Sequence, residues 1–199
     1  MFGGVDTMRA VFSALLLVGI AVMPSSVRAE GSVEPILTDD GIYTQPWFLE
    51  SFLDLAEDLD EAAANGKRFA IMWELKGCPY CEETHFVNFA DPEINAYVRE
   101  HFEILQLNYL GSRLVTDFDG EELEERALRQ KYGIRFTPTF QFFPENSAEI
   151  GDKVGQAAEV ARMPGYFKPD HFIAMFRYVD DKAYDQQNFR AYLAAQPSQ

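Results

Sequence analysis

The chain has only two cysteines, Cys78 and Cys81, and they are separated by two residues. A disulfide between them would close a very short segment, and the stability that a disulfide adds grows with the length of the loop it closes. Two thiols at this spacing can instead make and break a disulfide with each other and with a partner. The pair therefore indicates thiol–disulfide exchange rather than a structural crosslink.

The cysteines are predicted to lie where a strand gives way to a helix. Residues 68–75 form a short apolar run that ends at Gly77, which predicts a buried strand, and residues 78–89 predict a helix. Free backbone N–H groups at a helix start favour thiolate. We therefore predict that Cys78 is the exposed nucleophile with a lowered pKa, and that Cys81, one turn later, resolves the mixed disulfide.

Metal and haem chemistry fit this motif poorly. Haem attachment would need a histidine directly after the second cysteine, where Glu82 stands. A zinc site needs four ligands, and beyond carboxylates the chain offers only His85, His101 and His171. We predict no metal, and no cofactor other than the redox-active disulfide Cys78–Cys81.

The elements that must position the pair follow an α/β pattern. A strand and a helix alternate, which implies parallel crossovers, and a final strand pair implies an antiparallel edge in a central mixed sheet flanked by helices. The apolar spacing of Trp47, Phe48 and Phe52 predicts core residues on an extra N-terminal helix. The expected segments are helices at 46–63, 121–132, 169–180 and 185–195, a helix starting at 91–93, strands at 102–110, at 137–143 and within 147–162, and a polar loop at 112–120.

The first residues have the features of an export signal. Residues 10–23 are apolar except for Ser13, Arg9 precedes them, and Val27-Arg28-Ala29 fits a cleavage site. A membrane anchor is the alternative, but a spanning helix needs roughly 20 apolar residues. We predict a cleaved signal peptide over 1–29, an N-terminal arm over 30–45 and a single domain over 46–199.

The charge of the chain excludes some partners. With 32 acidic and 17 basic side chains, the formal net charge is −15. An acidic surface repels phosphate backbones and anionic lipid, so we expect no nucleic acid and no stable membrane association.

A second motif lies around Pro138. The sequence reads Tyr132-Gly133-Ile134-Arg135, two further residues, then Pro138-Thr139. Together with the cysteine pair, this segment resembles thioredoxins and implies a thioredoxin fold. The resemblance further implies that Pro138 is a cis-proline beside the cysteines and that the backbone of Thr137 pairs with substrate; a trans proline at an edge strand is the alternative. We predict that Thr137, Pro138, Pro79 and Tyr80 bind substrate.

Further segments are similar to the periplasmic thioredoxins of sulfur-oxidation systems, the SoxW type. They include Phe89 to Ile94, Val115 to Gly120, Pro164-Gly165-Tyr166 and Phe176 to Val179. The resemblance implies a monomeric periplasmic reductase of protein disulfides, acting on sulfur-oxidation or cytochrome-maturation partners and recharged by a membrane electron-transfer protein. The alternatives are a peptide-binding or chaperone module in which the redox pair is incidental, and a disulfide oxidant or isomerase.

One departure from thioredoxins concerns proton transfer. Thioredoxins carry a buried acid six residues before the first cysteine, where this chain has Met72. Strand alternation places Glu74 on the same face, so Glu74 is either a displaced proton acceptor for Cys81 or a solvent-exposed strand end. His85, four residues after Cys81, is either an ordinary packed histidine or a group that biases the protonation of Cys81.

Overall fold

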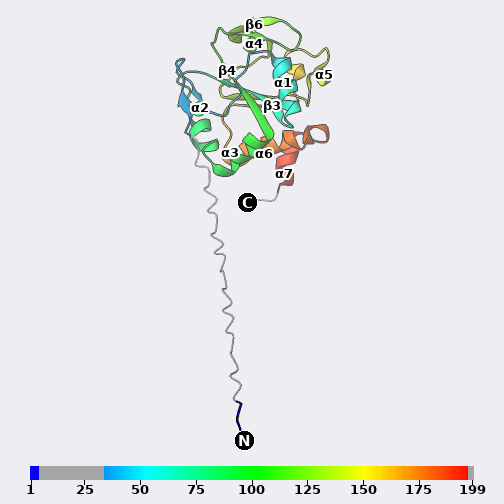
Figure 1. Ribbon diagram of the computed structural model, residues 1–199. Helices are drawn as coiled ribbons and strands as arrows, with labels where there is room; N and C mark the ends of the chain where they lie inside the picture. The colour runs from blue at the N-terminus through cyan, green and yellow to red at the C-terminus, as the bar shows by residue number, and fades with distance from the viewer. Residues whose placement is uncertain (5–33, 197–199) are drawn as a thin grey trace.

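The computed structural model describes residues 1–4 and 34–196 (Figure 1). Residues 5–29 of the expected signal peptide lie outside the described residues. Within the described part of the chain, none of the helices has the length and apolar character needed to cross a membrane.

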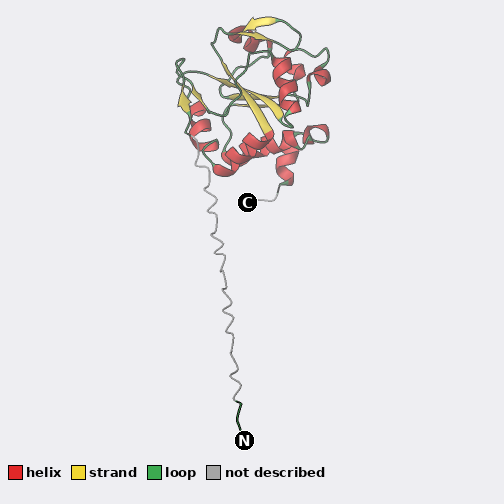
Figure 2. Ribbon diagram, in the orientation of Figure 1, coloured by secondary structure: helices red, strands yellow, loops and turns green. Residues whose placement is uncertain are grey.

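A four-stranded mixed sheet forms the centre of the molecule, with helices on either side (Figure 2). Its strand order is β4-β3-β7-β8. The pair β3–β4 is parallel, whereas β3–β7 and β7–β8 are antiparallel. The predicted α/β class with a central mixed sheet, a thioredoxin fold, is confirmed. The strands are β3 (Arg68–Glu74), β4 (Phe102–Asn108), β7 (Thr139–Phe142) and β8 (Ala161–Pro164).

Strand β3 is buried along its whole length because helices cover both of its faces. Ala70 and Met72 point to one side, which we call the α6 face, and pack with α3 (Pro92–His101), α6 (Pro169–Asp180) and α7 (Phe189–Ala195). The alternate residues Phe69, Ile71 and Trp73 point to the opposite side, which we call the α1 face, where α1 (Leu55–Ala64) and α4 (Glu125–Lys131) lie. Glu74, two residues after Met72, therefore belongs to the α6 face.

The predicted helices α3 and α6 form where expected. Asp91 caps α3, since its Oδ1 accepts the N–H groups of Glu93 and Ile94 at 2.9 and 3.0 Å, and Pro92 occupies the first turn. Helix α6 begins at Pro169 and ends at Asp180, as the apolar stripe of that segment predicts.

The N-terminal helix is shorter than predicted. It begins at Leu55 rather than at Pro46, because Asp54 caps it by accepting the N–H groups of Ala56 and Glu57, each at 3.1 Å. The chain before it turns at Leu53, whose φ is +65°. Phe48 still packs into the α6 face, but Phe52 is fully exposed, so the prediction that Phe52 is a core residue is wrong.

The segment predicted as a polar loop contains a small hairpin. Strand β5 (Leu114–Thr116) pairs with β6 (Glu122–Glu124), and helix α4 begins only at Glu125. Asp117 and Gly120 close the turn, where the Gly120 N–H donates to the Asp117 carbonyl at 2.8 Å and Gly120 has a φ of +79°. The dipeptide Asp119-Gly120 is typical of such hairpin turns.

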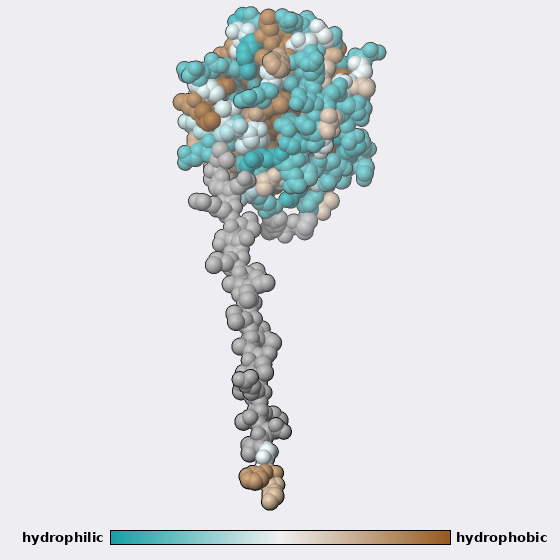
Figure 3. Space-filling view, viewed as in Figure 1, coloured by the Kyte–Doolittle hydropathy of each residue, from teal (hydrophilic) through white to brown (hydrophobic). Residues whose placement is uncertain are grey.

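Three more segments differ from the predictions. The N-terminal arm contains a short hairpin of β1 (Ile36–Leu37) and β2 (Tyr43–Thr44), and a hydrophobic patch lies over it (Figure 3). Between β7 and β8 the chain forms α5 (Ser147–Ile150) and a 3-10 turn (Gly155–Ala158). Helix α7 begins at Phe189, after a separate 3-10 turn (Ala183–Asp185).

Candidate functional site

Cys78 and Cys81 form a disulfide at the junction of β3 and α2 (Pro79–Glu83). Gly77 makes the sharp turn between the two elements with a φ of +72°, a conformation that glycine adopts most readily. Cys78 is the N-cap of α2, and its Sγ accepts the Cys81 N–H at 3.2 Å. The first sulfur lies at the helix start and the second one turn further in, as the sequence predicts. Cys78 is only 9% exposed, however, so the prediction that it is exposed is wrong for the disulfide form, in which Thr137 lies against its sulfur.

The second motif lies directly beside the first sulfur. The Thr137–Pro138 peptide bond is cis. The carbonyl oxygen and the Oγ1 of Thr137 both lie 3.4 Å from the Cys78 Sγ. The Gly165 N–H donates to the Pro138 carbonyl at 2.7 Å, which ties this turn to the end of β8. Residues 59 positions apart in the sequence therefore meet at one sulfur atom.

Exposed aromatic side chains accompany the disulfide. Tyr80, between the cysteines, is exposed and stacks on Tyr166 with ring centroids 6.0 Å apart. Burial raises the pKa of Tyr166, and the nearby Glu83 carboxylate raises it further. Phe136, just before Thr137, is also exposed. Sequence reasoning assigned Tyr80 to substrate binding but gave no role to Tyr166, whose contact depends on the tertiary fold.

Glu74 is completely buried, so the interpretation of it as a solvent-exposed strand end is wrong. One of its carboxylate oxygens is 2.8 Å from the His85 Nε2. The other accepts from the Gln106 side-chain amide, which also donates to the Tyr43 carbonyl at 2.5 Å. Both oxygens of the acid are therefore engaged by side chains, one by the buried His85 and the other by the half-buried Gln106.

His85 is buried as completely as Glu74 and connects it to the N-terminal arm. Its Nδ1 lies 3.1 Å from the side-chain nitrogen of Gln45. The ring packs against Phe48 and Phe89 at centroid distances of 5.9 and 5.8 Å. We call the hydrogen-bonded set Gln45–His85–Glu74–Gln106 the buried polar chain. Gln45 and Gln106 were missed from the sequence, because a lone glutamine carries no local signal of burial.

The helix that carries the cysteines changes pitch before it reaches His85. Helix α2 continues into a π-helical turn, Thr84–Asn88, in which the Phe89 N–H donates to the Thr84 carbonyl at 2.9 Å. Such turns are rare and occur often at functional sites. Here Thr84, His85 and Asn88 are buried while Phe86 and Val87 are exposed, so the turn directs the imidazole into the protein.

Metal-binding side chains do not gather elsewhere in the part of the chain that the structure describes. Residues 1–4 and 34–196 contain no group of three or more His, Cys, Asp or Glu side chains placed to hold a metal ion.

Several solved structures are similar to this chain. A thioredoxin-fold protein from Helicobacter pylori is 20% identical, covers 65% of this chain and 84% of its own, and has a TM-score of 0.50. A putative disulphide-isomerase from Bacteroides thetaiotaomicron is 23% identical, with 75% and 97% covered and a TM-score of 0.46. A thioredoxin from Thermus thermophilus is 24% identical, with 63% and 83% covered and a TM-score of 0.45. At these identities the likeness concerns the fold alone.

Among curated proteins no sequence matches this chain. A family model described as a thioredoxin-like domain matches residues 55–180. The match spans more than half of the chain and contains both cysteines, the cis-proline turn and the four strands of the central sheet. With the disulfide at the start of α2 and the strand order of the sheet, it shows that the chain belongs to the thioredoxin-like family.

Proposed function

We propose that the protein is an exported thiol–disulfide oxidoreductase that reduces disulfide bonds of other proteins. The observation that carries this proposal is the position of the Cys78 sulfur. It caps α2, where the Cys81 N–H donates to it, and it lies 3.4 Å from the Thr137 carbonyl. Helix-start N–H groups favour the thiolate, the form that attacks disulfides.

The proposed reaction takes two steps. The Cys78 thiolate attacks one sulfur of the substrate disulfide, forms a mixed disulfide and releases the other substrate sulfur as a thiolate. Cys81 then loses its proton and attacks the Cys78 sulfur, which breaks the mixed disulfide and releases the second substrate thiolate. Two electrons pass to the substrate, and the protein is left with the Cys78–Cys81 disulfide.

Substrate binding is assigned to the surface beside the sulfur. An extended substrate segment would pair with the backbone of Thr137, next to Pro138. Pro79 and Tyr80 would contact the residues that flank the substrate cysteine, with Tyr80 supported from behind by its stack on Tyr166. Exposed aromatic faces favour apolar contacts at such a site.

Glu74 is the proposed proton acceptor for Cys81. Cys81 is almost completely buried, so water has little access to its thiol. Glu74 is on the α6 face, and His85, which contacts it, lies one turn after Cys81 on the same helix. The burial of the Glu74 carboxylate and its contact with His85 support this role, although Glu74 is not at the sequence position that thioredoxins use.

The cellular setting is also a proposal. The predicted signal peptide and the similarity to SoxW-type thioredoxins support a periplasmic protein that acts on sulfur-oxidation or cytochrome-maturation proteins. A membrane electron-transfer protein would return the pair to its dithiol form, and the protein would act as a monomer.

A disulfide-reduction assay tests the proposal. Reduced full-length protein is mixed with insulin and dithiothreitol, and turbidity is followed. The wild-type protein should accelerate precipitation, and Cys78→Ser should abolish the acceleration. In a separate reaction, Cys81→Ser that has been reduced and freed of dithiothreitol should accumulate a mixed disulfide with insulin, visible by mass spectrometry, because the resolving thiol is gone. If Cys78→Ser keeps full effect, the peptide-binding alternative replaces the reductase.

A further inference from the structure

An exposed apolar patch lies beside the helix that carries the cysteines. It consists of Leu37 and Tyr43 on the β1–β2 hairpin and of Phe86 and Val87 on the π-helical turn, and we call it the arm patch (Figure 3). Leu37 is 58% exposed, Phe86 50% and Val87 43%. Contiguous apolar patches on a protein surface mark interaction sites, whereas scattered apolar side chains are ordinary.

The side chains of the arm patch form one surface. Leu37 pairs with Tyr43 in the register of the hairpin, so the two side chains lie on the same face. The Tyr43 ring meets Phe86 edge-on, with centroids 5.0 Å apart, and Val87 follows Phe86 in the turn. Because the family match begins only at residue 55, the N-terminal arm adds half of this surface to the thioredoxin-like domain.

The hairpin also contacts the chain just before the disulfide. A Cβ added at Gly41, in the turn of the hairpin, would lie 2.9 Å from the Lys76 Cε, so the Lys76 side chain packs against that turn. Lys76 is two residues before Cys78. At about 1.5 Å per helical residue, Phe86 lies roughly 12 Å beyond Cys78. The arm patch is therefore continuous with the surface that we assign to substrate binding.

The charges around the arm patch narrow the choice of its occupant. Asp39 and Asp40 are exposed at the hairpin turn, and Glu82 and Glu83 are exposed on α2, so four acids accompany the single Lys76 there. A second copy of this chain would bring the same acids face to face, and an anionic lipid surface would be repelled as well. The position beside the disulfide favours instead a protein whose disulfide the pair reduces.

We infer that the arm patch binds apolar side chains of the substrate protein, about four residues away from the cysteine that Cys78 attacks. An extended segment rises about 3.3 Å per residue, so four residues span the roughly 12 Å from Cys78 to Phe86. This inference rests on the proposed function and names a feature of its substrates. Since the patch does not touch the reacting sulfurs, it contributes to substrate binding and not to the chemical step.

Two peptides test the inference on the reduced full chain. Each has about twelve residues of glycine, serine and lysine around one cysteine, which carries thionitrobenzoate in a mixed disulfide. One peptide has leucine at the fourth position on either side of the cysteine, and the other has serine there. The Cys78 thiolate attacks the peptide sulfur, forms a mixed disulfide with it and releases thionitrobenzoate, the better leaving group. The absorbance of thionitrobenzoate gives the rate at each peptide concentration.

The leucine peptide should half-saturate the wild-type protein at an about fivefold lower concentration than the serine peptide, with the same maximal rate. Leu37→Ser and Phe86→Ser should each reduce this ratio to below about twofold. The ratio compares two peptides on one protein, so a uniform loss of active protein does not alter it. Leu37 is the more exposed of the two residues, so Leu37→Ser keeps the test open if Phe86→Ser fails to fold.

Val154→Ser is the matched control. Val154 is 53% exposed and follows β7, whose last residue pairs with Ala70 near the start of β3, at the opposite end of the sheet from Cys78. It should keep the fivefold ratio. Equal half-saturation of the wild type by both peptides, a ratio that survives in Leu37→Ser, or its loss in Val154→Ser contradicts the inference, while insulin reduction by the wild type still supports the proposed function. Failure of the wild type to reduce insulin contradicts the proposed function itself.

Discussion

The Cys78 sulfur lies between groups with opposite electrostatic effects. The Cys81 N–H, 3.2 Å away, stabilises negative charge on it. The Thr137 carbonyl oxygen, at 3.4 Å, has the opposite effect. The second sulfur, on Cys81, lies deeper and is capped by no comparable donor in the described contacts. Reactivity should therefore differ between two thiols of the same motif.

We expect iodoacetamide to alkylate Cys78 much faster than Cys81 in the reduced protein near neutral pH. The helix-start N–H favours the Cys78 thiolate, whereas Cys81 depends on a buried base. Peptide mapping after short exposures gives both rates in one experiment. Equal rates, or faster modification of Cys81, would contradict the assignment of nucleophile and resolving thiol.

The sequence predicts part of this site and leaves part of it out, for physical reasons. The cysteine pair and Pro138 are recognisable because each belongs to a short motif of residues that are neighbours in the sequence. Alternation along β3 placed Glu74 on the correct face, but its burial depends on Gln106 and on the arm that covers it. Gln45 meets His85 across 40 positions, a contact that only the folded chain creates.

At the scale of elements, the error at the start of α1 shows two local signals in competition. Apolar spacing and Pro46 favour a helix from residue 46, but Asp54 satisfies two free N–H groups and fixes the start at Leu55. The residues before it then pack by tertiary contact, so Phe48 is buried and Phe52 is not. Periodicity alone cannot separate these outcomes.

The two phenylalanines give a direct test of this boundary. Phe48→Ala should lower the free energy of unfolding by about 3–4 kcal/mol, because the ring packs edge-on against Phe89 and Trp47. Phe52→Ala should change it by less than about 0.5 kcal/mol, since Phe52 is fully exposed. Urea unfolding of both variants measures the difference. A comparable loss in both would indicate that the helix extends to Pro46.

Helix α1 also carries an acid on its buried side. Burial raises the pKa of Asp58 to about 6, and the neighbouring carboxylates of Asp54, Glu61 and Glu57 add to the rise. The Ser51 hydroxyl donates to Asp58 at 2.6 Å and opposes it. The unfolded chain titrates near the ordinary value of about 3.9. Between these two values the folded protein binds more protons, so its stability falls as the pH rises from about 4 to about 6.

Asp58→Asn should therefore stabilise the protein at neutral pH. Each unit of pKa shift corresponds to about 1.4 kcal/mol. With relaxation around the charge, we expect the free energy of unfolding to rise by about 1–2 kcal/mol at pH 7. The gain should shrink strongly near pH 4, where Asp58 is protonated in the folded state and about half protonated in the unfolded chain. Urea unfolding at the two pH values checks this, and a gain that is independent of pH would point to packing instead.

At the scale of the whole molecule, negative charge is the dominant electrostatic property. The formal net charge is −15, and most of the face shown in Figure 3 is hydrophilic. Glu82 and Glu83 bring this charge close to the disulfide, since both are exposed on α2 directly after Cys81. The Glu82 and Glu83 carboxylates therefore destabilise a thiolate on Cys78, whereas the free N–H groups at the start of α2 stabilise it.

This balance sets the expected direction of electron flow. A strongly stabilised thiolate favours the dithiol form and makes an oxidant, near about −120 mV, whereas a reducing thioredoxin lies near about −270 mV. We expect the Cys78/Cys81 couple to lie below about −200 mV when the full chain is equilibrated in thiol redox buffers. A value above about −150 mV would show the protein to be an oxidant.

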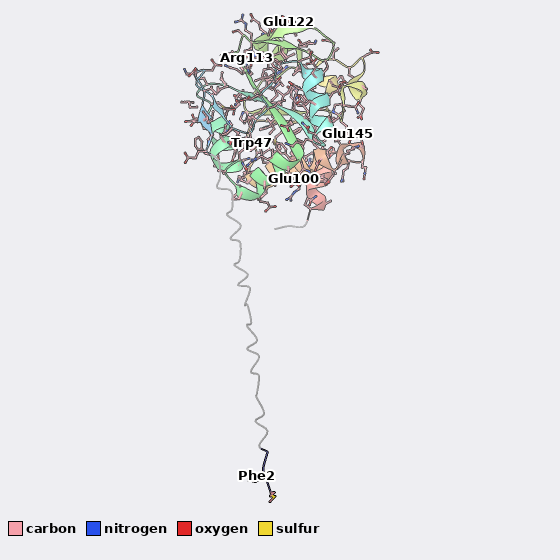
Figure 4. All side chains as sticks on the ribbon, viewed as in Figure 1. Phe2, Trp47, Glu100, Arg113, Glu122 and Glu145 are labelled. Atoms are coloured by element: carbon pink, nitrogen blue, oxygen red, sulfur yellow. A yellow bond between two sulfur atoms is a disulfide. The ribbon has the colours of Figure 1, made fainter. Side chains whose placement is uncertain are left out.

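Two double variants test whether Glu82 and Glu83 lower the reduction potential of the disulfide. Glu82→Gln with Glu83→Gln removes the repulsion beside Cys78. At about 0.2–1 kcal/mol for each exposed charge and about 30 mV per 1.4 kcal/mol, the potential should rise by about 10–40 mV. Glu100→Gln with Glu122→Gln removes the same charge from two exposed positions, which lie on opposite sides of the folded domain in Figure 4. Screening confines charge effects to roughly 8–10 Å in physiological salt, so this control should leave the potential unchanged. An equal rise in both would mean that the net charge of the molecule, rather than the acids on α2, tunes the disulfide.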